Sequence, residues 1–254
     1  MKSKLFWKEK LRTRYSMNKL IKILIIPFLG LFIQPLNAQT FGLKAGLNMS
    51  TMFEKDDQYT YSNNYTYNPG FHIGLTLDIP FNQVISFEPA LMFTTKGTKY
   101  EISESGIVLN GKANLYYIDV PLNFKLGFKL DRRGSNKVFF TAGPYIGYGI
   151  TGKLEASVDF NGQSESDSED VKWGDNAEED NFKNLDYGMT AGAGIELSAL
   201  TFGVFYDYGF ANISAYQENG LNAQNRVLKI SIGYRFNANS KGGHKRGGHK
   251  RRRR

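Results

Sequence analysis

The chain of 254 residues contains no cysteine and only two tryptophans, three histidines and seven prolines. Without cysteine there is no disulfide framework, thiolate nucleophile, cysteine-ligated zinc, iron–sulfur cluster or lipoprotein acceptor. After Ala38 the sequence also lacks a long apolar run: a transmembrane helix needs about 20 apolar residues, and no apolar stretch there approaches that length. These absences exclude cysteine chemistry and helical membrane spans for the mature chain.

The net charge of +8 lies at the two ends of the chain. Residues 1–38 and 241–254 carry eight basic residues each, whereas residues 39–240 hold 16 basic and 23 acidic residues, a net charge of −7. A nucleic-acid binder concentrates positive charge on its folded part. We therefore expect an acidic folded part and no nucleic-acid partner.

The N-terminal residues 1–38 have the composition of a secretory signal peptide. From Met17, which we take as the start, Lys19 and Lys22 precede the apolar stretch Ile23–Ile33 and the small residues before Gln39. The alternative is a retained anchor, which the shortness of the stretch disfavours. We predict cleavage after Ala38.

The C-terminal residues 237–254 include the unit Gly-Gly-His-Lys-Arg twice and lack apolar residues after Phe236 apart from one alanine. Such a segment has nothing to bury and is predicted to be a disordered cationic tail. Contact with anionic lipid, cell-wall polymer or nucleic acid, and metal capture by His244 and His249, are alternatives. Two mobile histidines fix no coordination geometry, so no metal site is predicted.

Between the ends, apolar residues recur with a period of two, which indicates strands. One parity carries large apolar side chains, and the other carries glycine and polar residues. Eight segments follow this pattern: Phe41–Thr51, Gly70–Ile79, Val84–Thr95, Leu115–Phe128, Val138–Ile150, Leu185–Leu197, Leu200–Phe210 and Arg226–Phe236.

The glycine-rich parity distinguishes a membrane barrel from a soluble β-sandwich. In a sandwich, every second residue of a strand faces water, and these water-facing positions are seldom rich in glycine. The interior of an eight-stranded barrel is only wide enough for side chains, so small residues must alternate with a few ionic ones. We predict an all-β fold for residues 39–236: an eight-stranded antiparallel up-and-down transmembrane β-barrel with lipid-facing residues such as Leu75, Phe124 and Val204.

The lengths of the connections agree with this topology. Outer-membrane barrels have short periplasmic turns and long outer loops. The first, third, fifth and seventh connections are long (52–69, 96–114, 151–184 and 211–225), whereas the others are Pro80–Gln83, Lys129–Lys137 and Ser198–Ala199. We expect the long connections to lie outside the cell.

Two of these connections have unusual compositions. The fifth has a net charge of −7 without the spacing of a calcium loop, so we expect a solvated, mobile surface. The first holds Tyr59, Tyr61, Tyr65 and Tyr67 among polar residues, which is typical either of partner or glycan recognition or of anchors at a membrane interface.

Ionic residues on the inward parity are predicted to meet in the periplasmic half of the lumen. They comprise three acids and three bases: Lys44, Asp78, Glu88, Lys125, Glu196 and Arg235. In a narrow lumen these charges must pair, so we predict a salt-bridged plug with Glu88 and Lys125 as its sharpest pair. A proton or ion path and carboxylate catalysis by Glu88 or Glu196 are the alternatives. His72 is expected to be a hydrogen-bonded lumen residue.

Catalytic signatures are absent from the sequence. The glycine patterns around Gly143 and Gly188 lack a following Gly-Lys-Ser/Thr, and no Gly-x-Ser-x-Gly motif occurs. We therefore predict no catalytic, cofactor-binding or metal-binding residue and no enzymatic activity.

Four short motifs resemble the PorT-type outer-membrane β-barrel family over residues 40–236. They are Phe41–Asn48, Tyr117–Leu122, Thr141–Tyr145 and Gly233–Phe236. The resemblance implies the outer membrane of a Gram-negative cell and assigns no catalytic residue; some relatives assist secretion or gliding machinery. The last strand resembles the signal read by the barrel-insertion machinery, with Tyr234 and Phe236 as its aromatic residues.

We therefore expect an outer-membrane barrel with a closed polar lumen and a structural or interaction role. Outer-membrane lipid and the barrel-insertion machinery are expected partners, together with an extracellular or periplasmic protein or glycan. The alternative is a narrow porin-like channel or a transport accessory, including a component of a secretion machine. Open aqueous channels occur in wider barrels of about 16 strands, which disfavours the channel.

Overall fold

The structure is a computed structural model that describes residues 39–104, 107–132, 134–160 and 163–236. The predicted signal peptide, residues 1–38, and the predicted tail, residues 237–254, lie outside the described residues. In the described part, two 3-10 helices occur, Tyr61–Asn64 (η1) and Glu218–Gly220 (η2). No helix in these ranges is long and apolar enough to cross a membrane.

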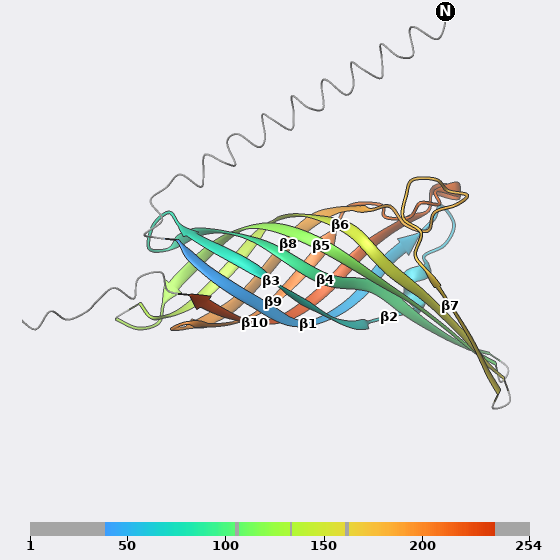
Figure 1. Ribbon diagram of the computed structural model, residues 1–254, viewed down its shortest axis with the longest axis horizontal. Helices are drawn as coiled ribbons and strands as arrows, with labels where there is room; N and C mark the ends of the chain where they lie inside the picture. The colour runs from blue at the N-terminus through green and yellow to red at the C-terminus, as the bar shows by residue number, and fades with distance from the viewer. Residues whose placement is uncertain (1–38, 105–106, 133, 161–162, 237–254) are drawn as a thin grey trace, which may run out of the picture. The chain divides into compact units, whose positions relative to one another are not determined.

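Strands make up most of the described chain (Figure 1). In chain order they are β1 (Thr40–Lys55), β2 (Tyr65–Thr66), β3 (Asn68–Pro80), β4 (Ile85–Glu104), β5 (Ile107–Lys129), β6 (Asn136–Phe160), β7 (Gln163–Asp170), β8 (Leu185–Leu197), β9 (Leu200–Gly209) and β10 (Asn222–Phe236).

Eight of these strands form a closed antiparallel ring. The order is β1-β3-β4-β5-β6-β8-β9-β10, and β10 pairs back onto β1. Strand β2 pairs with β4, and β7 pairs with β6, outside the ring. Because neighbours in the ring are neighbours in the sequence, the prediction of an eight-stranded up-and-down barrel is confirmed.

The alternation of side chains also follows the prediction. Leu75, Phe124 and Val204 point out of the ring and are 59%, 54% and 50% exposed, whereas inward residues such as Asp186 are buried. Several inward positions require glycine because the lumen is crowded: a Cβ atom at Gly46 would overlap the backbone of β10 and the His72 ring. The bulky outward residues therefore form the surface that contacts lipid.

The two ends of the barrel differ. At the end that we call the terminal end, Phe41 pairs with Phe236, and β8 joins β9 through Ser198 and Ala199. Ser198 has a φ of 57°, in the left-handed region that tight turns use. The opposite, distal end carries the connections β1–β3, β4–β5, β6–β8 and β9–β10.

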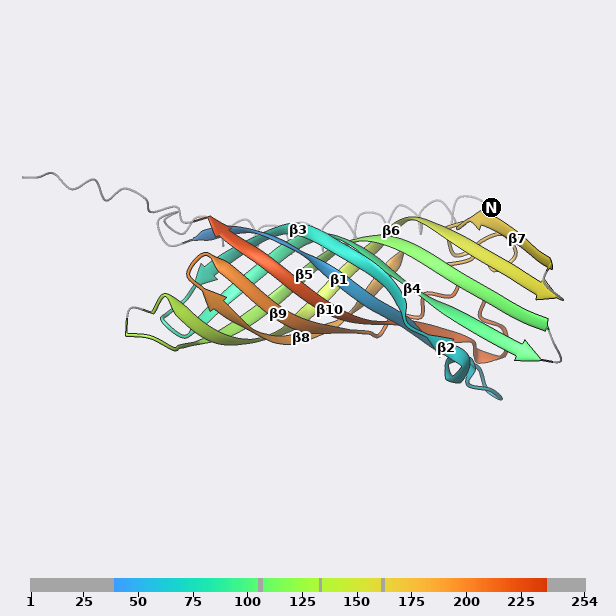
Figure 2. The same ribbon diagram turned by 90° about the horizontal axis from the view of Figure 1, so that it is seen from below.

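The predicted third and fifth connections are not loops for most of their length, and this part of the prediction is wrong. Strand β4 continues to Glu104, β5 starts at Ile107, and β6 continues to Phe160 and pairs with β7. These strands have 20, 23 and 25 residues for β4, β5 and β6, against about 9–11 for crossing a bilayer. Figure 2 shows β4 to β7 running past the other strands.

We call this projecting part the distal sheet. It comprises β2, residues 98–104 of β4, 107–113 of β5 and 153–160 of β6, and β7. The pairing of β5 with β6 shifts where the sheet leaves the barrel, since Tyr117 faces Gly149 and Tyr116 faces Thr151. Ile150 is thus the extra residue of a β-bulge, which reverses the inward parity of β6 beyond that point.

Candidate functional site

The six ionic residues predicted for the lumen come together near the terminal end. They come from six different strands and are joined by salt bridges, and we call them the terminal network: Lys44, Asp78, Glu88, Lys125, Glu196 and Arg235. All six side chains are at most 20% exposed. Three acids thus meet three bases in a largely buried part of the lumen.

Lys125 lies at the centre of the terminal network. Its Nζ donates to Glu88 Oε2 at 2.9 Å and to Glu196 Oε1 at 3.0 Å, and it also contacts the Asp78 carboxylate. The second oxygen of each glutamate pairs with another base. Lys44 Nζ is 2.8 Å from Glu88 Oε1, and Arg235 Nη1 is 2.6 Å from Glu196 Oε2. Each base therefore has a carboxylate partner, as buried charges require.

A second ionic cluster lies nearer the distal end and was not predicted. Lys96 Nζ is 2.9 Å from Asp119 Oδ2 and 2.9 Å from Asp186 Oδ2, and the Lys96 side chain is fully buried. The ammonium group also lies over the rings of Tyr117 and Tyr145, 4.7 and 4.5 Å from their centroids. We call these five residues the distal cluster. A signal for this cluster is present in the sequence. Glu88, Met92 and Thr94 are even-numbered residues of β4 that face inward, and Lys96 continues the same alternation.

Hydrogen-bonded polar residues fill the lumen between the two clusters. His72 is buried, with Nδ1 2.6 Å from Asn48 Oδ1 and Nε2 2.8 Å from Ser231 Oγ. Beside it, Lys229 Nζ is 2.5 Å from Asp207 Oδ2. The cavity between these residues has a volume of about 30 Å³, the space of a single water molecule.

Apolar residues close the distal end of the lumen. We call them the apolar closure: Met52, Leu115, Tyr117, Val171, Ala211, Ile213 and Ala223. Trp173 packs against it edge-on to Tyr117, with 5.5 Å between the ring centroids. The chain segments that follow β7 and β9 are held together by a backbone hydrogen bond of 2.8 Å from Lys183 N to Ile213 O. The fifth connection was predicted to be a solvated, mobile surface, and this part of it is instead packed onto the barrel.

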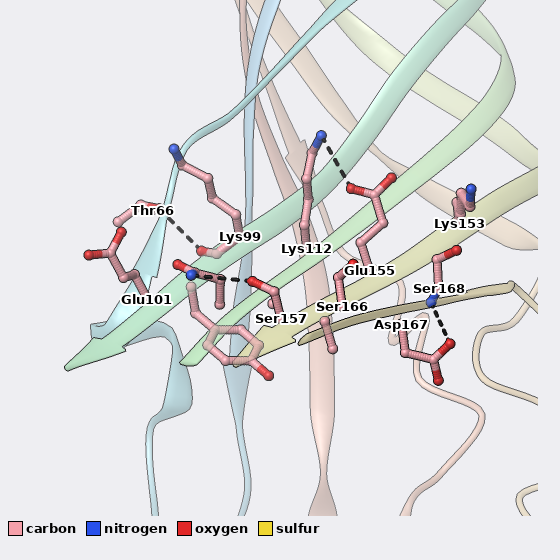
Figure 3. A pocket seen from close by; sticks show the side chains of 14 residues that line it. Thr66, Lys99, Glu101, Lys112, Lys153, Glu155, Ser157, Ser166, Asp167 and Ser168 are labelled. Atoms are coloured by element: carbon pink, nitrogen blue, oxygen red, sulfur yellow. Dashed lines mark hydrogen bonds and ion pairs between the residues drawn. The ribbon is translucent and has the colours of Figure 1, made fainter. Parts of the chain in front are cut away.

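A cavity lies outside the lumen, on the distal sheet (Figure 3). It has a volume of about 670 Å³, and its side chains are mostly polar: Thr66, Lys99, Tyr100, Glu101, Asn110, Lys112, Lys153, Glu155, Ser157, Ser166, Asp167 and Ser168. Figure 3 shows Lys112 and Glu155 pointing toward each other, and their Nζ and Oε2 atoms are 3.9 Å apart. A second groove of about 360 Å³ shares Tyr100, Gly111 and Asp167 with this cavity. The distal sheet therefore has room for a ligand.

The tyrosine-rich first connection is ordered by carboxylates. Asp56 accepts hydrogen bonds from Tyr61 Oη at 2.7 Å and from the backbone N–H groups of Gln58 and Tyr59 at 2.7 and 2.6 Å. The bond from Tyr61, followed by the backbone bonds, lowers the pKa of Asp56. The same side-chain bond is the main cause that raises the pKa of Tyr61. Tyr65 Oη donates to Glu54 at 2.6 Å, and burial followed by this bond raises the pKa of Tyr65. Two of the four tyrosines, Tyr61 and Tyr65, thus stabilise the conformation of the first connection through hydrogen bonds to carboxylates.

Tyr234 and Phe236, predicted to form the insertion signal, lie at the end of β10. Both side chains point outward and are about half exposed, and their rings are 5.1 Å apart and T-shaped. Within the residues that the structure describes, no group of three or more histidine, aspartate or glutamate side chains has a geometry able to hold a metal ion.

A family model for the outer membrane protein beta-barrel domain matches residues 37–215. The chain belongs to this family. The location in the outer membrane is thereby established, and the ring of eight strands is the part that crosses it. A comparison with curated proteins gives no match.

Solved outer-membrane proteins are similar to this chain at low identity. Ail of Yersinia pestis is 16% identical over 78% of this chain and 99% of its own, with a TM-score of 0.35. Neisserial surface protein A is 15% identical over 77% of this chain and 97% of its own, with a TM-score of 0.36. OprG of Pseudomonas aeruginosa is 15% identical over 81% of this chain and 100% of its own, with a TM-score of 0.41.

Proposed function

We propose that this protein is a closed outer-membrane barrel with a structural or interaction role, and that the distal sheet is its binding surface. The observation that carries the proposal is the position of the cavities relative to the lumen. The lumen is filled by two ionic clusters and the apolar closure, whereas the cavities of about 670 and 360 Å³ lie on the distal sheet. A binding partner therefore meets the sheet and not the lumen.

The filled lumen argues against the alternative of a narrow porin-like channel. Solute passage requires a continuous aqueous path, but the cavity among His72, Phe205 and Lys229 holds about 30 Å³. The opening at the terminal end, beside Lys125 and Arg235, holds about 120 Å³ and ends at the terminal network. Salt bridges in such a site are costly to separate, because each ion loses its partners in a water-poor space.

We assign the distal end to the outside of the cell and the terminal end to the periplasm. Short turns on the periplasmic side and long connections outside are the rule for outer-membrane barrels. In this orientation Tyr234 and Phe236 lie where the barrel-insertion machinery works, which supports their role as the insertion signal. Within the wider family we favour a PorT-type protein of a Gram-negative cell, without enzymatic activity; a role as accessory to a secretion machine is compatible with the closed barrel.

Crosslinking in intact cells tests the interaction role. A photoreactive amino acid replaces Ser166 on the distal sheet, and in a matched variant it replaces Ser135 between β5 and β6 at the terminal end; both positions are exposed. We expect the Ser166 variant to capture an extracellular protein or glycan that the Ser135 variant does not. Capture of outer-membrane lipid alone at Ser166 contradicts a binding role for the distal sheet.

A further inference from the structure

The inner face of the distal sheet, which continues the lumen side of the barrel, has an apolar row. Directly paired residues of antiparallel strands lie on the same face. Ile102 pairs with Leu109, Leu109 with Val158, and Val158 with Glu165, so these four form one row across β4, β5, β6 and β7. The three apolar side chains are 40–44% exposed although they lie beyond the length of strand that a bilayer covers.

The next two rows toward the barrel form the floor of the smaller groove. In the first row, Gly111 pairs with Ala156, and Ala156 pairs with Asp167. In the second row, Ala113 pairs with Leu154, and Leu154 pairs with Glu169. The Tyr100 ring covers Gly111, where a Cβ atom would overlap it. The groove of about 360 Å³ thus has an apolar floor and an acidic side formed by β7.

Charge is distributed unequally between the two faces. The inner face of β7 presents Glu165, Asp167 and Glu169, and among the described residues of the distal sheet no lysine or arginine lies on the inner face. Lys112 also borders the groove, but it lies on the outer face, where it approaches Glu155. The outer face therefore carries both signs of charge, and the inner face carries one.

The backbone of β7 has a free edge. In the described chain only β6 pairs with β7, and all eight β7 side chains are exposed. A strand edge of this kind is able to accept an added extended segment. Such a segment would alternate between the acidic inner face and the serine-rich outer face of β7.

We propose that the inner face of the distal sheet binds a cationic, extended peptide segment of an extracellular protein. Its lysine or arginine side chains pair with Glu165, Asp167 and Glu169, and its apolar side chains cover Ile102, Leu109 and Val158. The inference rests on the proposed orientation of the distal end. Charge complementarity excludes a second copy of this face, which is acidic as well. The chain's own basic residues 241–254 come after Phe236 in the sequence, and Phe236 lies at the terminal end of the barrel.

The test measures binding of a fluorescent peptide of alternating lysine and leucine to the full protein in zwitterionic phosphocholine nanodiscs. Two further probes replace lysine by glutamate, or leucine by serine. We expect saturable binding of the lysine–leucine peptide, with at least about tenfold weaker binding of either other probe. Equal binding of the lysine–serine peptide overturns the apolar part of the proposal, and no binding of the lysine–leucine peptide overturns all of it.

Matched variants locate the site. Asp167→Asn with Glu169→Gln removes two charges from the inner face of β7, and Asp159→Asn with Asp170→Asn removes two from the outer face of β6 and β7, at positions that do not line the groove. We expect the inner pair to raise Kd at least about tenfold and the outer pair to change it less than about twofold. Equal effects of the two pairs show nonspecific attraction and overturn the inference. Leu109→Ser, which removes an apolar contact without changing charge, is expected to weaken binding as well.

Binding of the peptide to the inner face is measured separately from the orientation, on which only the extracellular nature of the partner rests. Labelling from the cell surface and conductance measurements report the orientation and the closed lumen without any peptide. If labelling shows the reverse orientation or the barrel conducts, while the peptide binds the inner face, the proposed function is wrong and the binding site remains. If the orientation and the closed lumen hold while the peptide does not bind, only the inference is overturned.

Discussion

Lys96 Nζ lies 2.9 Å from Asp186 Oδ2 inside the lumen, and neither side chain has any exposed surface. The two residues belong to β4 and β8, which are separated in the ring by β5 and β6. A contact between non-adjacent strands requires their side chains to meet in the interior. This pair therefore shows directly that side chains, rather than water, occupy the barrel at this level.

Loss of the Lys96 charge is expected to destabilise the barrel strongly. Lys96→Met leaves Asp119 and Asp186 buried without their cation, and removal of one partner of a buried ion pair costs about 3–5 kcal/mol. The measurement is the free energy of unfolding in urea with lipid vesicles. Lys112→Met, at a half-exposed pair on the distal sheet, is the control and is expected to change that free energy by less than about 0.5 kcal/mol. Equal losses for the two variants would refute the assigned role of Lys96.

Glu88 and Lys125 are expected to be energetically coupled. A double-mutant cycle with Glu88→Gln and Lys125→Met should give a coupling free energy of about 1–3 kcal/mol, because the two groups share a buried network. The same cycle on the exposed Lys112–Glu155 pair should give less than about 0.5 kcal/mol. Additive effects of the Glu88 and Lys125 substitutions mean that the terminal network does not act as a unit.

The barrel and the terminal network follow from the sequence because their signal is local. A period of two residues assigns Lys44 and Lys125 to the inward face, and the topology then brings both to one end of the lumen. Lys96 was missed because the third strand was ended at Thr95, although the inward parity continues through it. A strand that projects beyond the membrane has no lipid-facing apolar residues to mark it.

The distal sheet and the apolar closure depend on contacts between distant segments. The β7 sequence Gln163–Asp170 has no apolar residue, and its strand conformation comes from pairing with β6. The bulge at Ile150 reverses the parity of β6, so alternation alone does not show which face Leu154 occupies. Trp173 and Ile213 are packed together by tertiary contacts that no local pattern reports.

Labelling of single cysteines is expected to establish the orientation. The chain has no cysteine, so Ser166→Cys and Ser135→Cys each introduce a single exposed thiol, at the distal sheet and the terminal end. A membrane-impermeant maleimide should label Ser166→Cys on intact cells and Ser135→Cys only after permeabilisation. Reversed labelling places the distal end in the periplasm.

The turn at Asp56 is expected to lose stability only in acid. Hydrogen bonds from Tyr61 and the backbone lower the pKa of Asp56, so the stabilisation is present above the ordinary aspartate pKa and is lost as the pH falls through the lowered value. In Asp56→Asn, Tyr61 should ionise at a lower pH than in the unmodified protein, because its raised pKa depends first on Asp56. Selective NMR labelling of Tyr61 measures this; unchanged ionisation rejects the assigned contact.

Conductance of the purified protein in planar lipid bilayers tests most directly whether the lumen is closed. The terminal network, the distal cluster and the apolar closure predict no steady current above that of the bare membrane, over a range of voltages and salt concentrations. Steady openings of the size seen with ordinary porins would contradict the account, because they require an aqueous path where Lys96 and Lys125 are buried and paired.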